Sequence, residues 1–327
     1  MSGDGYGALR DGAALADRRG LVRVIVGGGQ AAEAMNGLLT NDVLALTPGT
    51  GLYAAALTPK GKIIADVRVF RRTDDLLLDT SAAAAPGFLA MLRKYLNPRL
   101  AKWADVTAVL GGIGIAGPRS RAVLAAVLGH TDPALSAFVA YQHHRFQFDG
   151  AAVDVARVPD FGVEGFDLFV PVEVAAALAA RLSAAGAVPL DHEAAEVARV
   201  EAGLPLYGTD MGDDTLAQEA NLDELHGISY TKGCYTGQET VARVHFRGHV
   251  NRHLRGLRSE VALPWGASLT GANGQPCGDV RSTVHSPRLG HLALAMLRRE
   301  METGANVTVN WAEGEAEAQV VSLPFAE

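Results

Sequence analysis

The sequence predicts an α+β protein whose first part contains two related halves and whose last part is a small β-barrel or β-sandwich. Residues 74–79 and 165–170 are both strand-like, and each runs on into an alanine-rich helical segment. From about Arg252 onward, short apolar segments alternate with glycine and proline at regular spacing, which is typical of short strands. The two halves share the order of their expected strands and helices but not the same residues, so we expect them to have related topology.

The elements follow from apolar periodicity, with glycine and proline at most boundaries. In residues 58–61 a proline stands two positions before a glycine, which suits a type I turn and makes a hairpin of the flanking strands. In the first part we expect strands over 20–26, 51–57, 62–71, 76–80, 106–116, 151–158 and 166–170, and helices over 31–39, 86–95, 118–128, 172–185 and 191–201. Further on we expect a helix over 238–244 and strands over 254–257, 268–270, 278–284, 291–298 and 306–311.

The composition is that of a soluble globular protein. Of 327 residues, 48% are hydrophobic and 20% are charged, so we expect two or three domains with full cores. The net charge of −7 argues against a nucleic-acid partner, because such proteins usually carry a basic face. Two cysteines cannot form a disulfide framework, and we find no signal layout and no stretch of about 18 apolar residues. We therefore expect a cytoplasmic protein without membrane contact.

The most informative segment is 232–239, which contains Cys234. The small neighbours Gly233 and Gly237 leave this thiol accessible. Lys232 and the partly positive start of the following helix favour its thiolate form. This setting predicts a reactive or ligand-binding thiol, and a plain turn cysteine is the alternative.

Residues 112–117 match the dinucleotide fingerprint G-x-G-x-x-G. The fingerprint also needs an acidic residue about 20 positions further on, at the end of a second parallel strand. That region, 129–133, is predicted to be a loop without a strand, and Pro118 suits an ordinary first helical turn. We therefore interpret these glycines as structural.

His245, His249 and His253 recur at a spacing that would align metal ligands on a helix. Gly248 interrupts them, and four arginines share the run: Arg243, Arg247, Arg252 and Arg255. A divalent cation there would meet repulsive charges and no nearby carboxylate. We predict no metal site, and an anion-facing or RNA-facing basic strip is the alternative.

Asp66 and Asp167 stand among apolar residues on strand-like segments. Each can bond to backbone at a strand end, or can accept paired N–H groups of a pterin or purine. Arg199, on a predicted helix near Glu196 and Glu201, can form a surface ion pair or clamp the carboxylates of a ligand. The residues alone leave these alternatives open.

Three segments together, 201–208, 218–223 and 228–239, closely resemble the YgfZ-type folate-binding proteins, which are relatives of the glycine-cleavage aminomethyltransferase. Residues 39–43 are similar to the family's N-terminal pattern, and residues 278–287 to its C-terminal barrel. The resemblance covers nearly the whole chain in order. The cysteine motif is specific to the YgfZ branch, whereas the flanking patterns are shared across the superfamily.

The resemblance implies two related α/β lobes plus a small C-terminal β-barrel, arranged as a three-domain ring around a folate channel. The expected domains are a first folate-binding lobe over 1–110 completed by 200–247, a second α+β lobe over 111–199, and the barrel over 248–327. The implied cofactor is tetrahydrofolate or a derivative. The residues expected to bind it are Tyr53, Asp66, Asp167 and Arg199.

The implied function is an accessory role in the assembly or repair of iron–sulfur clusters, chiefly of [4Fe–4S] proteins, rather than conventional catalysis. Cys234 and Lys232 are the expected active residues, and Cys234 can ligate iron transiently or handle sulfur. Stable clusters need about four ligands, so we expect iron–sulfur assembly proteins and [4Fe–4S] client enzymes as partners. The alternative is a tetrahydrofolate-dependent, aminomethyltransferase-like one-carbon transferase.

Three positions depart from the aminomethyltransferase pattern. The paired aspartates after the hairpin are Ala65 and Asp66 here, so one acid is missing. Asp167 stands where those enzymes carry glutamate, which shortens the arm that faces the pterin. The aromatic residue that stacks on folate in some YgfZ proteins has no evident counterpart near Gly20. We therefore expect altered or weaker folate contacts.

Overall fold

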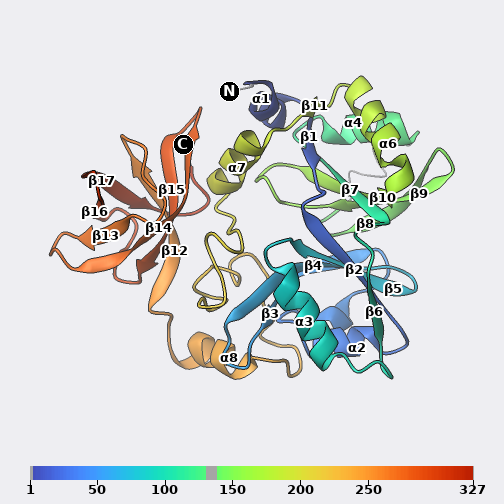
Figure 1. Cartoon of the computed structure of the whole chain (residues 1–327), viewed down its shortest axis with the longest axis horizontal. Helices are drawn as coiled ribbons and strands as arrows, with labels where there is room; N and C mark the ends of the chain where they lie inside the picture. The colour runs from blue at the N-terminus through green and yellow to red at the C-terminus, as the bar shows by residue number, and fades with distance from the viewer. Residues whose placement is uncertain (1–2, 130–137, 327) are drawn as a thin grey trace. The chain divides into compact units, whose positions relative to one another are not determined.

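The computed structural model describes residues 3–129 and 138–326 (Figure 1). They form two compact units, each assembled from separate stretches of the chain. Unit 1 consists of the residues up to Ala56 together with Ile64–Ala195 and His226–Thr236. Unit 2 consists of Leu57–Ile63, Glu196–Leu225 and the residues from Gly237 onward.

Unit 1 contains a five-stranded sheet with the strand order β3-β4-β5-β2-β6. Its central strand β5 is buried through its apolar stretch, because Leu76, Leu77 and Leu78 are fully covered. β5 pairs antiparallel with both β2 and β4. The elements of this part are β2 (Leu21–Gly27), α2 (Ala31–Asn36), the 3-10 helix η1 (Val43–Ala45), β3 (Thr50–Leu57), β4 (Ile63–Arg71), β5 (Asp75–Ser81), α3 (Ala85–Tyr95) and β6 (Lys102–Asp105).

A second, six-stranded sheet of unit 1 has the order β11-β1-β7-β10-β9-β8. Helices α4 and α6 cover it, and their residues Leu124, Leu178 and Leu182 are buried in its core. The elements are α1 (Gly3–Asp11), β1 (Ala14–Asp17), β7 (Leu110–Ala116), α4 (Ser120–Leu128), β8 (His143–Phe148), β9 (Ala151–Arg157), β10 (Gly165–Pro171), α6 (Val172–Ala184) and β11 (Val188–Pro189).

The two sheets share an aromatic core. Phe70 on β4 packs against Phe169 on β10, with 5.2 Å between the ring centroids. Leu77, Ala156 and Val158 complete this buried cluster. The apolar contact brings β4, β9 and β10 together, and these strands also carry charged side chains.

Unit 2 contains a closed barrel with the strand order β12-β15-β14-β13-β16-β17 (Figure 1). Alternate residues fill its interior, among them Leu257, Leu269 and Val309. Val200 near the end of α7 joins a further buried cluster with Leu254. The elements are α7 (His192–Glu201), α8 (Gln238–Arg247), β12 (Arg252–Ser259), β13 (Ser268–Gly271), β14 (Pro276–Ser286), β15 (Gly290–Arg298), β16 (Asn306–Trp311) and β17 (Gly314–Val321).

The predicted α+β fold class is confirmed, and the last part of the chain is a barrel rather than a sandwich. The predicted strand over 106–116 begins only at Leu110, because the backbone N–H groups of Val109 and Leu110 turn back to the carbonyl of Val106. Short or edge strands such as β1, β6 and β11 were not expected. The predicted ring, folate channel and domain boundaries stay predictions. Within the described residues, no helix is both long and apolar enough to cross a membrane.

Candidate functional site

Unit 1 holds a cluster of ion-paired side chains drawn from both of its sheets. Arg68 on β4 donates from Nε and Nη2 to Asp79 at 2.8 and 2.5 Å, and from Nη1 to Asp160 at 2.9 Å. Arg18 donates from Nε to Asp167 at 2.7 Å and from Nη2 to Asp160 at 2.8 Å. Two guanidinium groups therefore hold three carboxylates. We call these five residues the charged cluster.

Asp167 and Arg68 stay ionised in the charged cluster despite their burial. The Asp167 side chain is only 1% exposed. Burial favours its neutral form, but Arg18 and Arg68 outweigh that effect and lower the pKa of Asp167. Burial likewise opposes the charge of Arg68, whereas Asp79, Asp160 and Asp167 raise its pKa well above the usual value. Buried charges are tolerated when they are paired in this way.

The glycines of the dinucleotide-like motif make room for arginines. Arg23 on β2 is 1% exposed and donates to the carbonyls of Leu21 and Leu110 at 3.3 and 3.4 Å. A Cβ on Gly112 would overlap its guanidinium, and a Cβ on Gly114 would lie 2.8 Å from Arg18 Nε. This packing supports the structural interpretation of the motif. Residues 130–133 of the expected loop lie outside the described residues.

Asp66 on β4 carries a carboxylate oxygen that the protein leaves unsatisfied. The hydroxyl of Tyr53 on β3 donates to Asp66 Oδ2 at 3.0 Å. Oδ1 is buried and accepts no hydrogen bond from the described residues. Burial raises the pKa of Asp66, against the lowering effect of the Tyr53 hydrogen bond. Burial and Asp66 together raise the pKa of Tyr53 well above its usual value. Asp66 can therefore hold a proton, or accept an N–H donor at Oδ1.

Lys232 is engaged with backbone rather than with the cysteine beside it. Its ammonium donates to the carbonyl oxygens of Asn36, Leu39 and Asn41 at 2.5, 2.7 and 2.9 Å, and it lies 4.9 Å from the ring centre of Tyr235. Three acceptors match the three N–H donors of an ammonium group. Burial lowers the pKa of Lys232 to about 8. The expected help to the thiolate of the neighbouring cysteine stays a prediction.

Cys234 is an exposed free thiol, whereas Cys277 in the barrel is buried. The segment around Cys234 is tied down by backbone bonds, from Thr236 N to the carbonyl of Gly37 at 3.1 Å and from Ser229 N to that of Thr40 at 3.0 Å. The sulfur thus reaches solvent from an anchored backbone, as its glycine-rich setting predicted.

Arg199 in unit 2 uses its N–H groups for hydrogen bonds within the protein. Its side chain is 11% exposed. Nε and Nη2 donate to Glu196, Nη1 donates to the carbonyl of Leu204 and to Asp210, and Nη2 also donates to Ser282. A guanidinium has five N–H groups, and these bonds account for all of them. A ligand carboxylate would have to displace one of these partners.

The histidine series does not lie on one helix. Helix α8 ends at Arg247, so His245 is on the helix, His249 follows it, and His253 is on β12. Among residues 3–129 and 138–326, no group of three metal-binding side chains is found.

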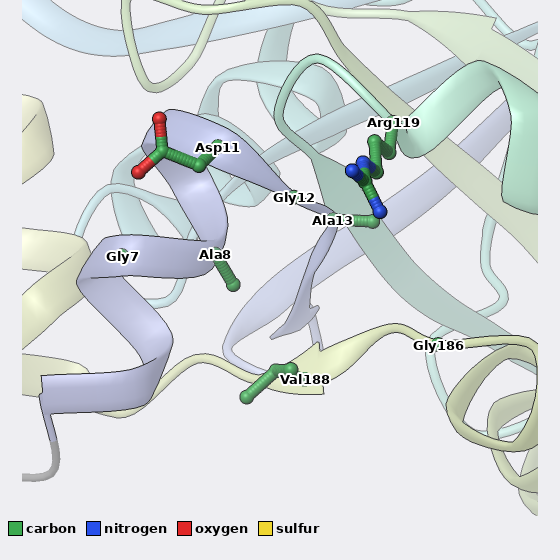
Figure 2. A pocket seen from close by; sticks show the side chains of 8 residues that line it. All are labelled: Gly7, Ala8, Asp11, Gly12, Ala13, Arg119, Gly186 and Val188. Carbon is green, nitrogen blue, oxygen red and sulfur yellow. The ribbon is translucent and has the colours of Figure 1, made fainter.

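Two cavities of similar size open in unit 1. The first has a volume of about 440 Å³, and Figure 2 shows it between α1 and the start of α4, with Asp11 and Arg119 among its lining residues. The second, of about 430 Å³, lies where β2 ends, beside Leu100 and Trp103. Neither cavity is lined by a predicted site residue.

Family models match most of the chain. The GCVT N-terminal domain matches residues 2–228, and the glycine cleavage T-protein C-terminal barrel domain matches residues 252–327. The chain belongs to the glycine cleavage T-protein family. A relative from Rubrobacter xylanophilus, named aminomethyltransferase, is 30% identical over 330 residues, which cover 97% of this chain and 84% of the relative. A second relative named aminomethyltransferase, from Cupriavidus pinatubonensis, is 31% identical over 342 residues. The match covers 98% of this chain and 88% of that relative.

A solved structure shares the T-protein fold. The crystal structure of the glycine cleavage system aminomethyltransferase T from Bartonella henselae matches with a TM-score of 0.88 and 24% identity, covering 99% of this chain and 89% of that one. The family models confirm the wider family, that of the glycine-cleavage aminomethyltransferase, to which the motifs were expected to be related. The finer assignment to the YgfZ branch stays a proposal.

Several members of the charged cluster escaped the sequence analysis. Arg68 and Asp79 interrupt apolar strands that were expected to be buried, and a charge in such a strand was the available signal. Asp160 lies between β9 and β10, where no periodicity applies. Nothing local distinguishes it from an ordinary loop aspartate.

Proposed function

We propose that this T-protein family member binds tetrahydrofolate or a derivative beside Asp66 and takes part in folate-dependent one-carbon transfer. The observation that carries the proposal is the buried, unsatisfied Oδ1 of Asp66. Leaving a buried carboxylate oxygen without a donor costs about 1–3 kcal/mol. A bound ligand with an N–H group would recover that cost, so the site fits a reduced pterin.

Tetrahydrofolate, when bound, supplies a nitrogen that can carry a one-carbon unit. The residues of the chain would orient the bound tetrahydrofolate and exchange a proton with its nitrogen. Tyr53 holds Oδ2 of Asp66, which leaves Oδ1 as the atom that faces the ligand. A raised pKa brings a carboxyl group nearer to neutral pH, where it works best as a general acid or base. Asp66 would thus hold the proton that moves to or from the ligand nitrogen.

The relatives support this transfer function. Both reported relatives are named aminomethyltransferase and align with nearly the whole of this chain. The test is a folate-dependent assay of aminomethyl or methyl transfer with purified protein and a range of donors. We expect turnover by the wild type and at least about a 100-fold loss in Asp66→Asn, since general acid–base catalysis contributes about 10²–10⁴. Asp74→Asn, at an exposed site of the same unit, is the matched control. No turnover with any donor would exclude the transfer function.

A second candidate is the iron–sulfur accessory role, and the exposed thiol of Cys234 favours it. An accessible thiolate can ligate iron or carry sulfur. A single cysteine would act only briefly, together with assembly proteins or [4Fe–4S] client enzymes in the cytoplasm. The names of the reported relatives favour transfer instead, so we rank this role second.

The two proposed functions can be distinguished in a strain from which the gene for this protein has been deleted. If the accessory role operates, Cys234→Ser will fail to restore the activity of [4Fe–4S] enzymes, whereas Cys277→Ser will restore it. Full complementation by Cys234→Ser would remove the accessory role and leave the transfer function untouched, because Asp66 is unchanged in that variant.

A further inference from the structure

The second cavity of unit 1, with a volume of about 430 Å³, has one wall without side chains. Gly27, Gly28 and Gly29 form this wall where β2 ends. A Cβ on Gly29 would meet nothing within 4 Å, so the space beside it is open. Gly28 has a φ of 121°, which favours glycine, and a Cβ there would lie 3.0 Å from the carbonyl oxygen of Leu100. The glycines thus let the loop after α3 approach the end of β2 and still leave a hollow.

The loop that lines this cavity is a hydrogen-bonded turn. The backbone N–H groups of Leu100 and Ala101 both donate to the carbonyl of Asn97, at 2.9 and 3.1 Å. The backbone N–H of Arg99 donates to the side-chain oxygen of Asn97 at 3.0 Å. Arg99 and Leu100 line the cavity from this turn. A ligand would meet a backbone that is already ordered, which reduces the entropy lost on binding.

The charged residues that line the cavity, Arg99 and Lys102, are both positive. Both side chains are exposed, and neither has an ion-pair or hydrogen-bond partner in the described part of the chain. Asp75, which pairs with Gly27 in the sheet, is held at both oxygens by Arg72, at 2.6 and 2.7 Å. Two cations are therefore left for a ligand. They match a phosphate monoester, which carries a charge of about −1.5 to −2 at pH 7.

The remaining lining residues provide room and an apolar surface for more than a phosphate group. The volume lies in the usual range for small-molecule sites. Ile25, Leu100 and Trp103 line the cavity, and no ring or cation of residues 3–129 and 138–326 stacks on the indole of Trp103. Trp103 and Lys102 lie on β6, an edge strand of its sheet, so a ligand along the open edge reaches both. Flat rings stack well on a free indole.

We propose that this cavity is a second small-molecule site of unit 1 and binds an organic phosphate that carries a flat ring, of which a nucleoside monophosphate is a simple example. Arg99 and Lys102 bind the phosphate oxygens, and the ring lies against Trp103. The glycine wall admits the ligand because no side chain competes for the space. Asp66 does not line the cavity, so this site is separate from the proposed folate site and does not depend on it.

Calorimetry with three probes tests the assignment. Adenosine 5′-monophosphate carries both features, adenosine carries only the ring system, and ribose 5-phosphate carries only the phosphate. We expect the monophosphate to bind at least about tenfold more tightly than either of the other two. Arg99→Gln should weaken binding of the monophosphate about tenfold and leave that of adenosine within about twofold. Trp103→Leu should weaken binding of both adenosine compounds but not of ribose 5-phosphate.

Lys94→Gln is the matched control, because Lys94 is exposed on the neighbouring turn of α3 and does not line the cavity. Gly29→Leu is a second variant that fills the cavity without changing a charge. It should abolish binding of the monophosphate, whereas Gly20→Leu, at a site where a Cβ also meets nothing within 4 Å, should keep it. A wild type that does not bind the monophosphate, equal weakening by Lys94→Gln and Arg99→Gln, or full binding by Gly29→Leu would overturn the assignment. The proposed folate function would stand in each case.

Discussion

The ammonium of Lys232 lies 2.7 Å from the backbone carbonyl oxygen of Leu39. Two further carbonyls, of Asn36 and Asn41, accept from the same group. Lys232 thus joins the cysteine segment to the chain between α2 and β3. From the local sequence alone, it was expected to act in the chemistry of Cys234. Both segments belong to unit 1, so the lysine stabilises the platform from which the thiol projects.

Lys232→Met should therefore destabilise the protein even without any ligand. Three carbonyl oxygens would lose a charged donor, and the loss of a buried network of this kind costs about 2–4 kcal/mol. Denaturant unfolding of the variant measures the cost, with Lys102→Met on the exposed strand β6 as control. Equal stability of the two variants would contradict the anchoring role and return Lys232 to the chemistry of the thiol.

Asp66→Asn should change how stability depends on pH. Burial raises the pKa of Asp66 in the folded protein, so between its ordinary and its raised pKa the folded state binds more protons than the unfolded state. Stability from this group is complete below that window and is lost as the pH rises through it. Asparagine does not titrate. The advantage of the wild type over Asp66→Asn should therefore shrink as the pH rises from about 4, the ordinary pKa of an aspartate, through the raised pKa of the folded protein.

Unfolding curves of both proteins at several pH values test this expectation, with Asp74→Asn as the exposed control. A difference in unfolding free energy that stays constant or grows with pH would show that Asp66 is ionised like an ordinary surface aspartate. The acid–base role proposed for it would then lose its physical basis.

Gly112→Ala should be costly although the substitution adds a single methyl group. The new Cβ would overlap the guanidinium of Arg23, which is buried against the carbonyls of Leu21 and Leu110. Overpacking of this kind costs about 1–3 kcal/mol. Gly20→Ala is the control, because a Cβ there meets nothing within 4 Å. Equal melting temperatures of the two variants would show that Gly112 is not needed for packing and would reopen the nucleotide-binding interpretation.

The sequence predicts this fold well where burial is periodic and poorly where it is not. The apolar run of β5 and the alternation of β12 to β16 are direct consequences of strand geometry. β17 was missed because its alternating residues are glutamate and alanine, which have low strand propensity. Its pairing with β12 and β16 closes the barrel, so long-range pairing decides what local propensity does not.

The residues of the candidate site also differ in how far the local sequence reveals them. Asp66 and Cys234 stand out locally, one as a charge in a buried strand and the other as a thiol among small residues. The partners of Asp167 are more than 90 positions away in the chain for Arg68 and 149 positions away for Arg18. The pair with Arg68 forms only when the two sheets of unit 1 pack together, and the pair with Arg18 forms only when β1 and β10 join the same sheet. No local pattern marks Asp160, whose character comes from its two arginine partners.

Reactivity should distinguish the two cysteines sharply. Cys234 is exposed, whereas Cys277 is 3% exposed and burial raises its pKa. A thiol reagent such as a disulfide dye should modify Cys234 at least about ten times faster, because attack needs both access and a thiolate. Cys234→Ser should abolish the fast phase and leave the unfolding free energy within about 0.5 kcal/mol of the wild type, as surface substitutions do. Cys277→Ser should keep the fast phase. A fast phase that survives in Cys234→Ser, or two equally slow thiols, would mean that the sulfur of Cys234 is not available to iron, sulfur or any partner.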